Sequence, residues 1–206
     1  RFPRWVPGSY FIREPMQHLS DLSAFCDGEE INIQRIDADG VRVKGLSNAS
    51  KLLVTYTVLA AEMTCRANHL DKTHVHIMPP YTWMMPSRGI DSERMNNTHK
   101  VTLDKPNDWQ TAIQLPGKEG EWFADGRDEL LDAIMESNPN KMISFDVKGC
   151  KQYLKLWDSG SLDFPKKGIE RLIEAMKTII EEHYALFGIP EWKEYWTVLH
   201  FTDSGR

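Results

Sequence analysis

Residues 164–201 read FPKKGIERLIEAMKTIIEEHYALFGIPEWKEYWTVLHF, and this stretch carries the clearest structural pattern of the chain. Apolar residues recur in it at spacings of three and four, which predicts an amphipathic helix that begins near Phe164-Pro165 and ends near Phe187-Gly188. The apolar positions are Ile169, Leu172, Ile173, Met176, Ile179, Ile180, His183 and Leu186. Gly188 suits the left-handed position after a helix, and the segment from Trp196 to Phe201 then predicts a buried strand.

The residues before this helix favour strands instead. Residues 51–59 alternate and are rich in β-branched and aromatic side chains, and residues 142–147 and 153–157 are shorter versions of the same pattern. A turn at 37–40 is followed by an alternating strand at 41–44, and one short helix is expected near residues 128–135. We therefore predict a mainly β, antiparallel sheet or sandwich up to about residue 160, followed by a helix and a strand that begin an α/β domain.

The domain organisation is inferred from this change of pattern. The polar, glycine-containing segment 158–163 is the expected boundary, so residues 1–160 form one domain and residues 161–206 begin a second. The chain starts without Met at Arg1, and it stops soon after the last predicted strand. We expect the 206 residues to be an internal piece of a longer protein, with the helix and strand of the second domain made to pack into a sheet that other residues supply.

Composition excludes several classes of partner. The net charge is −5, with 25 basic and 30 acidic residues mixed along the chain, so a nucleic-acid partner is not expected. No apolar run approaches the roughly 20 residues that span a bilayer, so membrane association finds no support. The three cysteines are widely separated and form no C-x-x-C pair, which favours a reducing compartment, and we expect a cytoplasmic protein.

The densest group of possible metal ligands is His69, Asp71, His74 and His76. In a strand, His74 and His76 project from one face, and zinc would need a third ligand such as His69 or Asp71. The other interpretation is that these are ordinary, partly exposed strand residues. The sequence contains no H-E-x-x-H, no G-x-S-x-G and no phosphate-binding or dinucleotide-binding loop, so it offers no catalytic residue, and we expect no metal to be bound by this chain.

The stretch WVPGSYFIR at residues 5–13 is the most distinctive segment of the first half. A tight turn at Pro7-Gly8, with Ser9 bonding its own backbone, would present the hydroxyl of Tyr10 and the guanidinium of Arg13 to a cleft. Alternatively, Tyr10 belongs to a core and Arg13 forms an ion pair.

Two more segments carry the same ambiguity. Arg66 can serve either a cleft or an ion pair. The Met-rich and aromatic residues 78–86 can either line a pocket or close a loop over a core.

Several segments occur in the order in which they are found in the glycyl aminopeptidase family of zinc metallopeptidases, which the chain resembles. The most specific is WVPGSYFIR at 5–13, and the others are VTYTV at 54–58, RANHLD at 66–71, VTLDKPNDW at 101–109 and DELLD at 128–132. The resemblance implies an N-terminal β-rich domain, a thermolysin-like catalytic domain and, in many members, a PDZ domain. This chain would cover most of the first domain and the start of the second.

The resemblance also implies the catalytic part of the parent protein. Family members continue into a G-G-L-E-H-type segment that binds the peptide, and then into H-E-x-x-H with a distal glutamate, where zinc polarises the carbonyl and the motif glutamate deprotonates the attacking water. None of those residues is present here, so we expect this chain to be inactive alone. Gly8, Ser9, Tyr10 and Arg13 are the residues that the resemblance places toward the substrate cleft. The alternative function is a non-catalytic β-sandwich module that binds or scaffolds.

Overall fold

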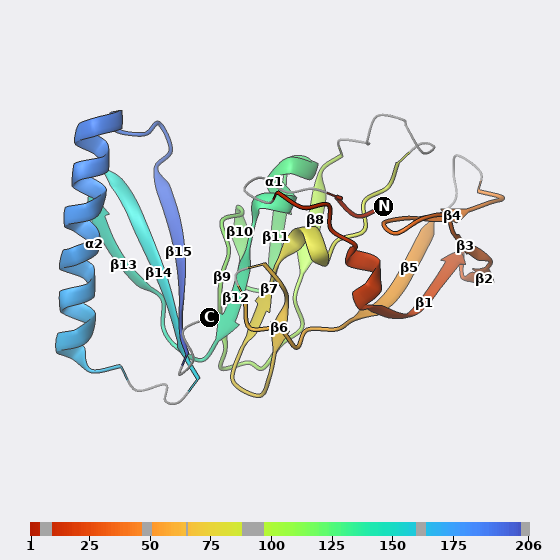
Figure 1. The fold of residues 1–206 in the computed structure, drawn as a ribbon, viewed down its shortest axis with the longest axis horizontal. Helices are drawn as coiled ribbons and strands as arrows, with labels where there is room; N and C mark the ends of the chain where they lie inside the picture. Colours follow the sequence, from red (N-terminus) through yellow and green to blue (C-terminus); the bar gives the residue numbers. More distant parts are fainter. Residues whose placement is uncertain (5–9, 47–50, 65, 88–96, 160–163, 203–206) are drawn as a thin grey trace. The chain divides into compact units, whose positions relative to one another are not determined.

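A computed structural model describes residues 1–4, 10–46, 51–64, 66–87, 97–159 and 164–202 (Figure 1). The strands are β1 (Leu19–Cys26), β2 (Glu29–Ile31), β3 (Ile33–Arg35), β4 (Val41–Val43), β5 (Leu52–Val58), β6 (His69–Leu70), β7 (Val75–Ile77), β8 (His99–Thr102), β9 (Gln110–Ala112), β10 (Gly117–Lys118), β11 (Glu121–Ala124), β12 (Met135–Asn138), β13 (Ile143–Val147), β14 (Cys150–Asp158) and β15 (Glu194–Phe201). The helices are α1 (Arg127–Asp132) and α2 (Lys166–Phe187), with the short 3-10 helices η1 (Pro15–His18) and η2 (Pro79–Tyr81). The prediction of a mainly β chain is confirmed.

The chain folds as two compact units that interleave in sequence. Unit 1 comprises residues 1–70, 77–100 and 123–134, and unit 2 comprises residues 71–76, 101–122 and 135–206. The predicted domain boundary at 158–163 lies partly outside the described residues, and the division of the parent protein at that point stays a prediction.

In unit 1 the main sheet has the order β2-β1-β5 and is antiparallel throughout. Ala24 lies at its centre, opposite Ile31 on one side and Val54 on the other, and is fully buried. The alternating pattern at 51–59 is thus confirmed as β5, and the pattern at 41–44 as β4, which pairs with β3.

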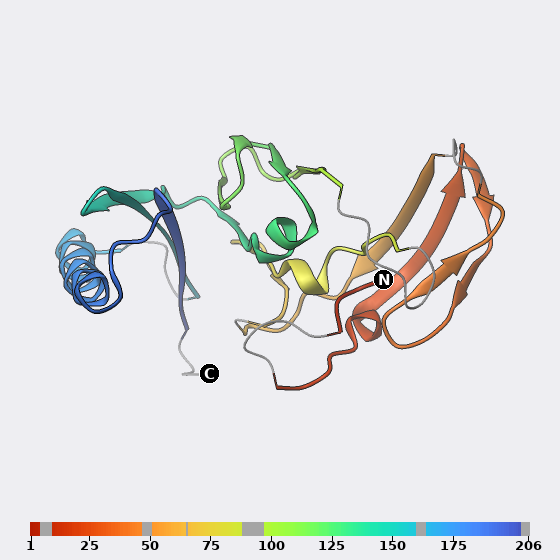
Figure 2. The ribbon, with the colours of Figure 1, turned by 90° about the horizontal axis from the view of Figure 1, so that it is seen from above.

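Unit 2 is organised around the nine-residue strand β14. It pairs antiparallel with β13 and parallel with β15, where Leu154 lies opposite Thr197. Helix α2 connects β14 to β15 and lies along one face of this sheet, as seen from two directions in Figures 1 and 2. The β14–α2–β15 connection supplies the length that a parallel pair requires.

This pairing gives the strand after α2 a partner within the chain, because β14 lies beside β15 along its whole length. β15 is the edge strand of the described sheet β13-β14-β15, and its extension by further residues of the parent stays a prediction. The sequence pattern could not show the pairing with β14, since a parallel partner is set by the path of the chain and not by local alternation.

The apolar stripe of α2 is only partly covered. Ile169, Leu172 and Ile173 are half-buried, whereas Ile179 and Leu186 are 57% and 75% exposed. The predicted end of the helix is confirmed, because Gly188 follows it with a φ of +89°, a conformation that favours glycine. In the described part of the chain, neither helix combines the length and the apolar composition that crossing a membrane requires.

The short helix expected at 128–135 ends earlier than predicted. Its last residue is Asp132, and Met135 begins the next strand, β12. All four residues of β12 are buried, and three of them lie opposite residues of β9, so burial and pairing override the helical pattern.

Candidate functional site

The predicted substrate-facing segment is only partly visible. Gly8 and Ser9 lie outside the described residues. Tyr10 is 95% exposed and does not belong to a core, and the guanidinium of Arg13 lies 5.7 Å from the centre of the Phe11 ring. Arg13 also hydrogen-bonds Tyr81, whose pKa is nevertheless raised, because burial outweighs the effect of the nearby charge. Whether this segment faces a substrate cleft stays a prediction.

The segment at 78–86 is anchored within unit 1. The hydroxyl of Tyr56 donates to the Thr82 carbonyl at 2.7 Å and accepts from the Met84 amide at 3.2 Å. Pro79 and Met85 are buried beside it. Loop closure over a core therefore accounts for residues 78–86. Arg66, which lies in the same unit, is exposed.

The most concentrated buried polar group of the described structure lies in unit 2, around Glu136 of β12. We define the Glu136 cluster as Glu136, His74, His76, Asn138 and His200. Nδ1 of His74 lies 2.9 Å from Oε1 of Glu136, and Nδ1 of His76 lies 3.2 Å from Oε2. Nε2 of His200 lies 2.9 Å from Oε2, and the Asn138 amide donates to Oε1 at 3.0 Å.

Three segments of unit 2 supply these side chains. His74 and His76 lie just before and within β7, Glu136 and Asn138 lie on β12, and His200 lies on β15. Because side chains alternate along a strand, His74 and His76 reach the same carboxylate, as the sequence predicted that they would share a face. The side chains of Glu136 and His74 are fully buried, and that of His200 is 16% exposed.

Aromatic rings enclose the cluster. The His74 ring stacks on Trp157 with centres 3.8 Å apart and planes 13° apart. The His200 ring stands edge-on to His76 at 4.9 Å and to His74 at 5.3 Å. This packing fixes the orientation of each imidazole and excludes bulk solvent.

The electrostatics of the cluster favour an ionised Glu136. Burial acts to raise its pKa, but the hydrogen bonds from His200, His74 and His76 outweigh burial and hold the pKa well below its ordinary value. A second buried charge, Lys155 of β14, donates to the carbonyls of Asn138, at 3.1 Å, and of Asn140. Burial lowers the pKa of Lys155 to about 8, although the charge of Glu136 acts in the opposite direction.

Sequence reasoning found only half of the cluster. It proposed His69 or Asp71 as a further ligand beside His74 and His76, and His69, Asp71 and His74 do offer a set of ligand atoms within 4.8 Å of one another. It did not predict that Glu136 and His200 would also meet His74. Glu136 lies 62 residues after His74, and His200 lies 64 residues after Glu136, so no local spacing could connect them. The available signal was a charged residue directly after Met135 and a histidine inside the predicted strand at 196–201, both unusual positions for buried groups.

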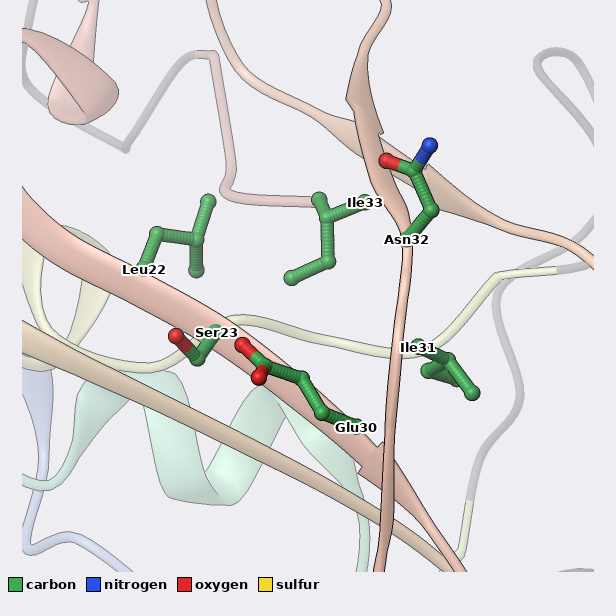
Figure 3. Close-up of a pocket in the computed structure, with 6 residues that line it drawn as sticks. All are labelled: Leu22, Ser23, Glu30, Ile31, Asn32 and Ile33. Carbon is green, nitrogen blue, oxygen red and sulfur yellow. The ribbon is translucent and has the colours of Figure 1, made fainter.

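The cluster contains one of the two groups of described residues that could hold a metal ion, the other being His69, Asp71 and His74. His74, Glu136 and His200 each offer one ligand atom, and these atoms all lie within 4.8 Å of one another. In contrast, the open pocket of unit 1 in Figure 3 is lined by Leu22, Ser23, Glu30, Ile31, Asn32 and Ile33. Glu30 is the only ionisable group among those six, so this pocket provides no comparable set of donors.

The chain is similar to one known domain family and to a solved structure. Residues 1–136 match the family model described as the peptidase M61 N-terminal domain. A solved structure described as an aminopeptidase N family protein from Idiomarina loihiensis has a TM-score of 0.79 and 21% sequence identity, covering 95% of this chain and 33% of that chain. The present chain thus spans about a third of the length of that protein, and the likeness establishes a shared fold. No curated protein matches the chain.

Proposed function

The chain belongs, through residues 1–136, to the peptidase M61 N-terminal domain family, and on this premise we propose that it is the N-terminal part of a zinc-dependent metallo-aminopeptidase. The family match is the observation that carries the proposal. It is supported by the fold, which is shared over 95% of this chain with a third of a longer protein described as belonging to an aminopeptidase family. The substrates of the complete protein would be peptides with a free amino terminus.

In this proposal the chemistry belongs to residues beyond the 206 of this chain. Zinc in the parent would polarise the scissile carbonyl and activate water, and H-E-x-x-H is the motif that holds it in the family. The sequence has no such motif, so we assign no catalytic residue here. The proposed parent protein would also contain a PDZ domain. We further propose a cytoplasmic location, because the thiols of Cys26 and Cys150 are free, as is usual in a reducing compartment.

We propose that the segment containing Gly8, Ser9, Tyr10 and Arg13 shapes the substrate cleft of the parent. Tyr10, Phe11 and Ile12 are 95%, 69% and 75% exposed, and consecutive exposed aromatic and aliphatic side chains are typical of a surface that contacts another body. The role of this part of the chain would be to limit access to peptide ends.

The first test compares this chain with a longer chain from the same gene. We expect aminopeptidase activity on glycyl and alanyl peptides from the longer chain only, and an H-E-x-x-H in its additional sequence. A longer chain without that motif and without activity would contradict the proposal and favour the non-catalytic binding module.

The second test addresses the cleft segment in the active longer chain. Tyr10→Ala and Arg13→Ala should each lower kcat/KM by about tenfold, the usual worth of one polar contact to a charged group. Arg42→Ala, at the exposed position of β4, is the matched control and should leave kcat/KM unchanged. Equal effects of Arg13→Ala and Arg42→Ala would remove Arg13 from the cleft.

A further inference from the structure

Two imidazoles and one carboxylate converge in the interior of unit 2 with the spacing of metal ligands. The ligand atoms of His74, Glu136 and His200 lie within 4.8 Å of one another, and the three residues come from three different segments of the same unit. We propose that they form a binding site for a divalent transition-metal ion, represented by Zn²⁺.

The distances are close to those of a coordinated ion. The two imidazole–carboxylate distances are both 2.9 Å. Zinc bonds of about 2.0–2.2 Å in a tetrahedral arrangement place neighbouring ligand atoms about 3.3 Å apart. Each imidazole nitrogen therefore lies about 0.4 Å closer to its own carboxylate oxygen, Oε1 for His74 and Oε2 for His200, than neighbouring zinc ligands lie to each other.

The chemistry of the donors selects the class of ion. Imidazole nitrogens with one carboxylate suit zinc, nickel, copper and iron, whereas magnesium and calcium require mainly oxygen ligands. Three protein ligands leave a coordination position open for water. The positive charge of Lys155 interacts with the Glu136 carboxylate, and it would repel a cation bound there. We therefore expect the ion to bind more weakly than in a closed site with four protein ligands.

A second observation is that, in the described part of the chain, one buried nitrogen of the cluster is left without a hydrogen bond. His76 is 95% buried, since its exposed fraction is 5%, and its Nε2 has no hydrogen-bond partner among the described residues. A buried polar atom of this kind calls for a ligand or water nearby.

This inference replaces the expectation from the sequence that the 206 residues bind no metal. It is independent of the proposed function, because it concerns residues of this chain and not the H-E-x-x-H motif of a longer one. It uses His74, as the sequence suggested, but takes Glu136 and His200 as the other ligands.

The test uses the 206-residue chain, first freed of metal with a chelator. Titration calorimetry with ZnCl₂ and metal analysis after dialysis should give one zinc per chain, and CoCl₂ should give the visible absorption of a tetrahedral site. His200→Gln and His74→Gln should each weaken zinc binding by more than about 100-fold, because even partners that only orient a ligand are worth 10–100-fold. His183→Gln, on the exposed side of α2, is the matched control and should bind zinc as the unaltered chain does.

His200→Gln is the decisive variant, because its side chain is partly exposed and its loss is the easier one to tolerate. Far-UV circular dichroism and urea unfolding without metal establish that each variant is folded. Zinc well below one per chain in the unaltered protein, or equal zinc binding by folded His200→Gln, would overturn the proposal and leave a hydrogen-bonded network only.

Discussion

The buried ammonium of Lys155 makes the stability of unit 2 depend on pH in a predictable direction. Lys155 has no exposed surface, and burial lowers its pKa from 10.5 to about 8. Between these values the unfolded chain binds the proton and the folded chain does not, so the free energy of unfolding rises with pH. Below pH 8 the lysine is charged in both states, and the cost of burying that charge is fully present.

The size of the effect is set by the shift. A difference of about 2.5 pKa units, at about 1.36 kcal/mol per unit, gives about 3 kcal/mol more stability at pH 10.5 than at pH 7 from this group alone. The sign is unusual, because most lysines are exposed and contribute no such slope. The expected result is a urea midpoint that increases from pH 8 to pH 10.5.

The direct assay is an NMR titration of the protein labelled with ¹³C at the lysine side chains, kept in chelator. One resonance should titrate near pH 8, and this resonance should be lost in Lys155→Met. Urea unfolding followed by tryptophan fluorescence should show a midpoint that loses its pH dependence in Lys155→Met and keeps it in Lys118→Met, which alters an exposed residue. A Lys155 resonance that titrates at or above pH 10.5 would refute the reasoning, whatever the variants do to stability.

Two further substitutions test how the backbone and one buried amide support the units. Gly117→Ala should lower stability more than Gly149→Ala does. A Cβ at Gly117 would lie 2.3 Å from the Glu121 carbonyl oxygen, whereas a Cβ at Gly149 meets nothing within 4 Å. The urea midpoints of the two variants measure this difference, and equal midpoints would contradict it. Asn68→Ala should cost about 1–3 kcal/mol, since it removes the side-chain oxygen that accepts from the Met78 amide at 2.7 Å. An unchanged urea midpoint would show that this loop does not need the Asn68 side chain.

The sequence predicted well those features that have a local period. The helix at 164–187, its end at Gly188 and the strand at 51–59 are predicted from spacings of a few residues, and all are present as α2 and β5. Features that depend on distant pairing were missed or misplaced. The partner of β15 is β14, and the strand that Met135 begins pairs with β9 through its next three residues. Neither pairing is encoded in a local pattern.

The candidate site shows the same division. Alternation placed His74 and His76 on one face, whereas Glu136 and His200 could be joined to them only by the path of the chain. Opposite charges and donors attract regardless of their separation in sequence, but which ones meet is decided by the folded backbone. The sequence can therefore indicate that histidines and carboxylates are available for such a cluster, but not which of them come together.

The Glu136 cluster also bears on where the family domain ends. The family match stops at residue 136, yet the carboxylate of Glu136 is bonded to His200, which lies in the part of the chain beyond the match. Unit 2 likewise combines residues 71–76 and 101–122 from the matched part with residues 135–206. Removal of the chain beyond the match would take one of the four hydrogen-bond partners from the buried carboxylate of Glu136 and leave His74, His76 and Asn138. Unit 2, which includes Glu136, therefore extends through β15, beyond the end of the family match.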